Sequence, residues 1–178
     1  MTTTKNDALL NFARVVIRIV QILLGIATAA LTFGIPFVLF GRNIIEREMR
    51  EETGNMAATF PHWEVAGLLV LFLATVVLTF LFLRKLLAII NTVGDGDPFI
   101  PLNAERLTHM AWLMVAVQAL AIAIVPLVVR VQLAFDEVDP TMDADVDLGG
   151  IVLALTLFIL ARVFRQGSAM RADLEGTV

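Results

Sequence analysis

The chain has 178 residues, of which 58% are hydrophobic, and a mean hydropathy of +0.85, whereas soluble domains are about 45–50% apolar. It has a net charge of -4 with no basic cluster suited to a nucleic acid, and it has no cysteine, which excludes disulfide scaffolds, thiol catalysis and thiolate metal sites. The apolar residues form four long runs. They predict an all-α fold: one membrane domain, residues 1–178, with four transmembrane helices.

The first run predicts a transmembrane helix at 19–41, which begins directly after a segment with two arginines. The positive start and Ala27-Thr28-Ala29 are also typical of a cleaved signal peptide, but cleavage there would leave residues 31–40 as an isolated apolar tail. Residues 42–53 carry arginine and glutamate at i,i+4 spacing, which predicts a solvated helical extension on the outer side.

The second and third runs predict spans at 63–85 and 108–130. A tryptophan at one boundary of the second span and an Arg-Lys pair at the other are typical of interfacial anchors. Turn-forming residues between the two runs predict a cytoplasmic loop at 91–107, in which Asn103 is expected to cap the following helix.

The last third of the chain contains an acidic segment and the shortest apolar run. Residues 131–147 have several carboxylates and no lysine or arginine, so they are expected to form an outer loop. The fourth run predicts a span at 148–165, which reaches spanning length because two arginines near its end can extend to the lipid headgroups. Residues 166–178 are expected to form a short polar tail.

The distribution of positive charge predicts the orientation of the chain. Lysine and arginine are more frequent on the side that holds the two termini and the 91–107 loop than on the side that holds residues 131–147. The positive-inside rule therefore places both termini in the cytoplasm.

No group of residues predicts catalysis or a cofactor site. His62 and His109 are expected about a bilayer thickness apart, so they cannot share one haem iron. Asp143, Asp145 and Asp147 match positions one, three and five of an EF-hand calcium loop. The loop also needs glycine at position six and glutamate at position twelve, where this chain has Leu148 and Ala154. We expect no enzyme activity, no cofactor and no metal site, while weak cation binding by the acidic loop 136–147 stays open.

The predicted spans contain few polar side chains. No carboxylate, lysine or histidine lies at mid-depth, which argues against proton-coupled transport. A glutamine in the third span is expected to form a hydrogen bond between helices, and small residues at i,i+4 spacing predict close helix approach. The predicted packing residues are Gly25, Ala29, Gln118, Gly150 and Ala154.

Two short motifs flank the third and fourth spans. The first is Gly96-Asp97-Pro98-Phe99 with Asn103-Ala104-Glu105-Arg106-Leu107. The second begins Leu160-Ala161-Arg162-Val163-Phe164-Arg165-Gln166-Gly167 and continues through Met170 and Arg171 to the end of the chain. In these motifs and in its four apolar runs, most of the chain resembles DUF2975, a domain-of-unknown-function family of small bacterial four-helix membrane proteins.

Members of that family are commonly encoded beside a small Cro/CI-type helix-turn-helix regulator. The resemblance therefore implies a multi-pass protein of the bacterial inner membrane that holds or releases a transcription regulator, without itself binding nucleic acid. The alternatives are an accessory subunit of a larger respiratory or photosynthetic membrane complex and, third, a small transporter or channel; homo-oligomers are compatible with each.

Both motifs are expected on the cytoplasmic face, where a soluble partner would bind. The alternative interpretation is that their polar residues have only structural roles, in which they cap helices and contact anionic lipid headgroups. The predicted interaction surface comprises Asp97, Pro98, Phe99, Asn103, Arg106, Leu107, Phe164, Arg165, Gly167 and Arg171.

Overall fold

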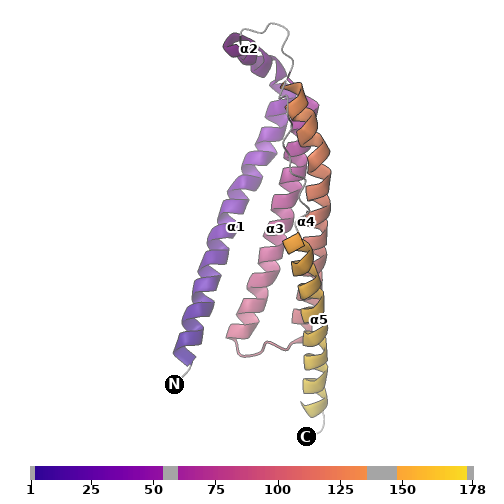
Figure 1. Cartoon of the computed structure of the whole chain (residues 1–178). Coiled ribbons are helices and arrows are strands. Elements are labelled where there is room, and N and C mark those ends of the chain that lie inside the picture. Colours follow the sequence, from indigo (N-terminus) through magenta and orange to yellow (C-terminus); the bar gives the residue numbers. More distant parts are fainter. Residues whose placement is uncertain (1–2, 54–59, 136–147, 176–178) are drawn as a thin grey trace. The chain divides into compact units, whose positions relative to one another are not determined.

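The computed structural model describes residues 3–53, 60–135 and 148–175, and almost all of them are helical. No strand occurs in these three stretches, so the predicted all-α fold class is confirmed. In chain order the helices are α1 (Thr3–Phe40), α2 (Arg42–Thr53), α3 (His62–Gly94), α4 (Pro101–Ala134) and α5 (Leu148–Glu175) (Figure 1).

Four of these helices, α1, α3, α4 and α5, are long and apolar enough to cross a membrane, and they contain the four predicted apolar runs except for Gly41, which follows the end of α1. They extend well beyond the runs. At about 1.5 Å per residue, the 33 residues of α3 cover about 50 Å, compared with about 30 Å for the hydrocarbon core of a bilayer. The ends of such helices must therefore project out of the hydrocarbon.

Helix α2 differs from the other four in length and polarity. It has 12 residues and many charges, and Gly41 separates it from the end of α1. It occupies the stretch for which the alternating charges predict a solvated helix, and its basic residue Arg50 lies in the last turn, where a cation favours the helix dipole. This helix is too short and too polar to span a bilayer.

The helices divide into two compact units, to both of which α1, α3 and α4 contribute. The first unit combines Met1–Gly25, Leu78–Gln118 and Asp147–Val178, so it holds both sequence motifs and the whole of α5. The second combines Ile26–Val77 and Ala119–Val146 and includes α2.

The first unit has a hydrophobic core in which α3, α4 and α5 meet. Three phenylalanines and one leucine from α3 and α5 pack around its buried members. The core residues are Ile89, Leu107, Met110, Ala111, Leu157 and Ala161, surrounded by Phe82, Leu86, Phe158 and Phe164. This core fixes the end of α3, the start of α4 and the middle of α5 against one another.

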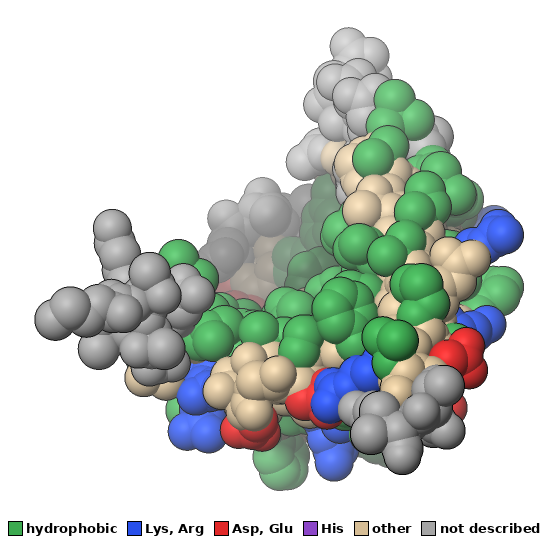
Figure 2. Space-filling model, turned by 90° about the horizontal axis from the view of Figure 1, so that it is seen from below, with side chains coloured by type: hydrophobic (Ala, Val, Ile, Leu, Met, Phe, Trp, Pro, Cys, Tyr) green, Lys and Arg blue, Asp and Glu red, His purple; other side chains and the backbone are tan. Residues whose placement is uncertain are grey.

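Much of the rest of the described chain exposes large apolar side chains, among them Phe33, Phe72, Ile122 and Ile159. Figure 2 shows how much of one face is hydrophobic, with charged side chains confined to a few places. Such a surface is unfavourable in water, whereas acyl chains solvate it readily. The exposed apolar surface thus agrees with helices that lie in lipid.

Candidate functional site

The turn after α3 explains why the first motif begins with Gly-Asp-Pro. The amide of Gly96 donates to the carbonyl of Val93 at 3.1 Å, and the amide of Asp97 donates to the carbonyl of Thr92 at 3.0 Å. These two bonds form a Schellman motif, which needs a residue with positive φ at its centre. Gly96 has φ 85° and meets this need without strain, and Pro98 then prevents the helix from continuing.

Helix α4 begins earlier than expected, and this changes the role of Asn103. The helix starts at Pro101, whose missing N–H is no loss in the first turn, so Asn103 lies inside that turn instead of capping it. The prediction that Asn103 is the cap is therefore wrong. The loop between the helices covers only residues 95–100, which is shorter than the predicted loop 91–107.

Asn103 is fully buried and holds the loop onto α3. Its Nδ2 donates to Thr92 Oγ1 and to the carbonyl of Pro98, both at 2.8 Å. Its Oδ1 accepts from Arg106 Nη1 at 2.9 Å. Arg106 also donates to the carbonyl of Ala88 at 3.1 Å, so this half-buried arginine joins the first turns of α4 to α3. The side chain of Asn103 thus uses its donors and its acceptor within the protein.

The two motifs contact each other. Arg171 of α5 donates to the Asp97 carboxylate, and the ring of Phe99 lies 5.2 Å from that of Phe164 between centroids. Phe99 also lies directly against the backbone of Gly167. We call this set (Asp97, Phe99, Phe164, Gly167 and Arg171) the loop–tail contact. Within this set, Asp97 and Arg171 are 74 positions apart in the chain.

The loop–tail contact lies beyond the apolar part of the spans. The first turns of α4 contain Glu105 and Arg106, while α5 contains Arg162 and Arg165 directly after its apolar stretch. Charged side chains in the hydrocarbon are costly, so these segments are expected at or outside the headgroups. The two motifs therefore meet at one end of the first unit, where water is available.

The structure distributes the predicted interaction residues between core and surface. Leu107 belongs to the hydrophobic core and Asn103 is fully buried, so neither can contact a partner directly. Phe99 and Arg171 stay partly exposed at the loop–tail contact. Arg165 does not join this contact, and lines a separate cleft on α5.

The predicted packing residues also separate. No atom outside its own helix backbone lies within 4 Å of a Cβ added at Gly25, and Ala29 is exposed, so this pair makes no close helix approach within the described chain. Gly150 and Ala154 are buried, and Ala154 lines one cavity together with Gln118. The small-residue pair on α5 is therefore buried, whereas the pair on α1 is exposed.

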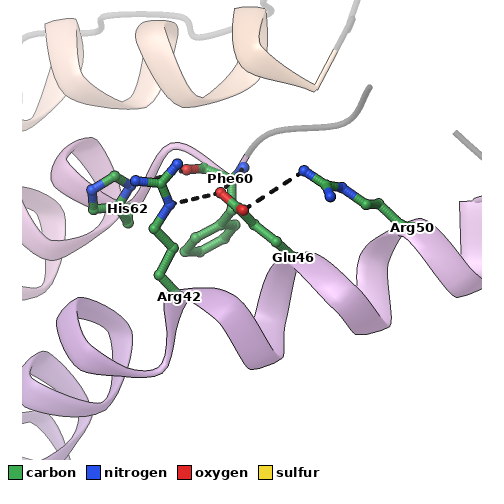
Figure 3. A network of polar contacts seen from close by, with 5 residues as sticks. All are labelled: Arg42, Glu46, Arg50, Phe60 and His62. Atoms are coloured by element: carbon green, nitrogen blue, oxygen red, sulfur yellow. Dashed lines mark hydrogen bonds and ion pairs between the residues drawn. The ribbon is translucent and has the colours of Figure 1, made fainter. Parts of the chain in front are cut away.

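A second polar network lies on α2, in the other unit. Glu46 Oε1 accepts from Arg42 Nε at 2.8 Å and from the backbone amide of Phe60 at 3.4 Å, and Arg50 Nη2 lies 3.8 Å from Glu46 Oε2 (Figure 3). The hydrogen bond from Arg42 holds the pKa of Glu46 below its usual value; burial acts in the opposite direction, and the Phe60 amide lowers the pKa further. Glu46 thus connects α2 to Phe60, which lies just before the start of α3.

Neither histidine belongs to a metal-binding group in the part of the chain that the structure describes. The Nδ1 atom of His62 lies 3.2 Å from the carbonyl of Phe60, and the His62 ring is tilted against the Trp63 ring with 5.2 Å between centroids. His109 is exposed on α4. The acidic segment 136–147, for which cation binding stays a hypothesis, lies outside the described residues.

Several residues at this end of the first unit were not predicted from the sequence. Thr92 accepts the bond from Asn103, and its own hydroxyl donates to the carbonyl of Ile89 at 2.8 Å. The guanidinium of Arg14 lies against Gly94, so α1 reaches the end of α3, where a cation is favourable. The bond between Thr92 and Ile89 is local, whereas the bond between Thr92 and Asn103 crosses the loop and the contact of Arg14 with Gly94 joins distant parts of the chain.

Together, the four apolar helices and the exposed hydrophobic surface define a multi-pass integral membrane protein of the all-α class. The family model described as "Protein of unknown function (DUF2975)" matches residues 46–178, and the chain belongs to this family. The match includes both motifs and begins within α2. Comparison with curated proteins and with solved structures gives no match.

Proposed function

We propose that this chain is a non-enzymatic regulatory protein of the bacterial inner membrane, with both termini in the cytoplasm, and that it binds a cytoplasmic helix-turn-helix regulator. The proposed binding surface is the second half of α5 together with the exposed part of the loop–tail contact. The excess of lysine and arginine on this side supports the orientation. The family resemblance supports the kind of partner.

The observation that carries this proposal is a pair of apolar side chains in a polar helical segment. Met170 is 62% exposed and Leu174 is 72% exposed, four residues apart on one face of α5. The same segment carries Arg171 and Asp173, so it is expected in water and not in lipid. Apolar residues at this spacing in water are typical of a helix that docks against a partner.

The loop–tail contact provides a second observation that supports the same binding surface. Phe99, which is 42% exposed, adds an aromatic side chain beside α5, and the exposed ion pair of Asp97 with Arg171 adds a polar rim. An apolar centre with a polar rim is the usual composition of a protein–protein interface. Because Phe99 packs on α5, the position of the loop determines the shape of this surface.

The proposal is tested by co-purification of the membrane-embedded protein with a Cro/CI-type helix-turn-helix regulator of the kind encoded beside members of the family. The variant Met170→Lys/Leu174→Lys should reduce the recovered regulator by more than about tenfold, because loss of an interface anchor costs about 2 kcal/mol or more. The matched control is Ala172→Lys, which adds a charge on the opposite side of the same exposed helix. Unchanged recovery in the double variant, or an equal loss in the control, would contradict the proposal.

A further inference from the structure

A cleft of about 420 Å³ lies between α4 and α5 in the first unit, on the side where α5 presents two arginines. Its wall on α4 includes Thr108, and its wall on α5 includes Arg162 and Arg165, one helical turn apart. Phe158 and Ala161 form its apolar floor. The cleft thus combines two cations with polar and apolar surface.

The two arginines of the cleft differ from Arg14, Arg106 and Arg171 of this unit, each of which is bonded to another side chain. Arg106 is bonded to Asn103 and Arg171 to Asp97, while Arg14 is bonded to Asn11 at 3.0 Å. Arg162 and Arg165 make no ion pair with any side chain that the structure describes, and no carboxylate lines the cleft. Two adjacent guanidinium groups without a counter-charge favour an anionic ligand.

The cleft continues toward the apolar part of the spans. A second cavity of about 250 Å³ shares Phe158 with it and is otherwise lined mostly by apolar residues. Its lining residues are Val115, Gln118, Ile151, Ala154, Leu155 and Phe158. Trp112 lies edge-on to Phe158 at 5.5 Å and is 61% exposed, and tryptophan is typical of the depth at which headgroups meet acyl chains.

We propose that this pair of cavities binds an anionic phospholipid, with the phosphate at Arg162 and Arg165 and an acyl chain along Ile151 and Leu155. The arginines supply charge complementarity at the headgroup end. The apolar cavity one to two turns away supplies the surface for the acyl chain. Phe158 lies between the two parts, where the glycerol backbone is expected. This lipid site does not depend on the proposed regulator.

Trp112 provides a direct measurement, because it contacts Phe158 and the chain has only 2 tryptophans. In the Trp63→Phe background, the full-length protein is reconstituted into phosphatidylcholine vesicles that contain brominated phosphatidylglycerol or, in parallel, brominated phosphatidylcholine. Brominated phosphatidylglycerol should quench Trp112 more strongly at equal mole fraction. The relative binding constant should favour it by about fivefold for each arginine that contributes.

Three variants distinguish specific lipid binding in the cleft from non-specific attraction of anionic lipid to basic residues. Arg162→Gln/Arg165→Gln should remove the preference for phosphatidylglycerol, while Arg162→Lys/Arg165→Lys, which keeps the charge, should retain most of it. The matched control Arg84→Gln/Lys85→Gln removes two basic residues of α3 that do not line the cleft and should keep the full preference. Equal quenching by both lipids in the parent protein, or an equal loss in the control, would overturn the proposal.

A soluble phosphate ester tests whether the acyl chain is part of the ligand. Glycerol phosphate at millimolar concentration carries the headgroup chemistry without the chains, so it should leave the quenching preference unchanged. If glycerol phosphate abolishes the preference, the cleft binds a soluble phosphate and the lipid proposal fails.

Discussion

Phe99 lies so close to Gly167 that a Cβ added at position 167 would be 2.8 Å from the ring carbon Cδ1. Real Cβ atoms almost never come this close to another atom, so the absence of a side chain at 167 lets the ring pack on α5. The relationship connects a residue of the loop after α3 to a residue in the middle of α5's second half. It gives a physical role to a residue of each motif.

Gly167→Ala should therefore have opposite effects in two backgrounds. In the parent protein, crowding of this kind costs about 1–3 kcal/mol, which exceeds the gain of about 1 kcal/mol from replacing a helical glycine with alanine. We expect a loss of roughly 1 kcal/mol in the free energy of unfolding. In the Phe99→Ala background the crowding is absent, so the same substitution should stabilise the protein by about 1 kcal/mol.

Unfolding in mixed detergent micelles measures both values. The control is Ser168→Ala, which changes the neighbouring residue of α5, whose hydroxyl donates to the local carbonyl of Arg165 at 2.9 Å. If Gly167→Ala stabilises the parent protein as much as it stabilises the Phe99→Ala variant, the ring of Phe99 does not pack on Gly167.

Replacement of Asn103 should destabilise the protein more than any exposed substitution at this end. Asn103→Ala leaves the carbonyl of Pro98 and one donor of Arg106 without their partner, and a buried polar group left unpaired costs about 1–3 kcal/mol. We expect a loss of about 2–3 kcal/mol in the free energy of unfolding. Thr92→Val should show strong coupling to it in a double-mutant cycle, because the two side chains share a hydrogen bond.

Asn91→Ala is the matched control for Asn103→Ala, since Asn91 is an exposed asparagine near the end of α3. Its effect should stay within about 0.5 kcal/mol. If Asn103→Ala is equally mild, the buried hydrogen bonds of Asn103 do not hold the loop.

The spans were predictable because their signal is local, whereas the loop–tail contact was not. Four apolar runs select helices by length and composition alone, and apart from Gly41 at the end of the first run each lies within a helix of the structure. The contact of Phe99 with Gly167 joins residues far apart in the chain, and no pattern within either motif predicts a contact with the other. The sequence therefore indicated two separate motifs on one face, and the structure shows that they pack together.

Asn103 shows how a correct local rule can lead to a wrong role. Asparagine before an Ala-Glu-Arg segment is typical of a helix cap, but Pro101 begins the helix two residues earlier. Asn103 consequently falls in the first turn, where its side chain points to Thr92 and Pro98. By contrast, the turn at Gly96 follows from its sequence, because glycine before Asp-Pro favours the positive φ that the turn needs.

The network on α2 should depend on pH in one direction. The pKa of Glu46 in the folded protein is lower than its usual value of 4.5, so ionised Glu46 stabilises the fold. That contribution is fully present above pH 4.5 and is lost as the pH falls through the lower pKa of the folded state. With selective ¹⁵N-phenylalanine labelling, the amide proton of Phe60, which donates to Glu46, should shift upfield across this acidic range as its bond weakens.

Two substitutions of glutamate on α2 separate this effect from general titration. Glu46→Gln should remove the acidic shift of the Phe60 amide, because the amide side chain does not titrate in this range. Glu48→Gln, at an exposed position of the same helix, should leave the shift in place. A Phe60 amide that is insensitive to acid in the parent protein would contradict the bond to Glu46.

The contact between the two motifs can be tested directly, because the chain has no cysteine. In the variant Phe99→Cys/Gly167→Cys, the two new thiols are the only ones present. The proximity of Gly167 to the Phe99 side chain brings these positions within the range that a disulfide requires. The control Phe99→Cys/Ala172→Cys places the second thiol elsewhere on the exposed part of α5.

Both variants are oxidised in native membranes, and the products are identified by non-reducing electrophoresis and mass spectrometry of the linked peptides. The structure predicts a rapid intramolecular disulfide between positions 99 and 167 and little or none between 99 and 172. Equal or faster cross-linking in the 99/172 control, or no cross-link between 99 and 167, would contradict the contact between the two motifs.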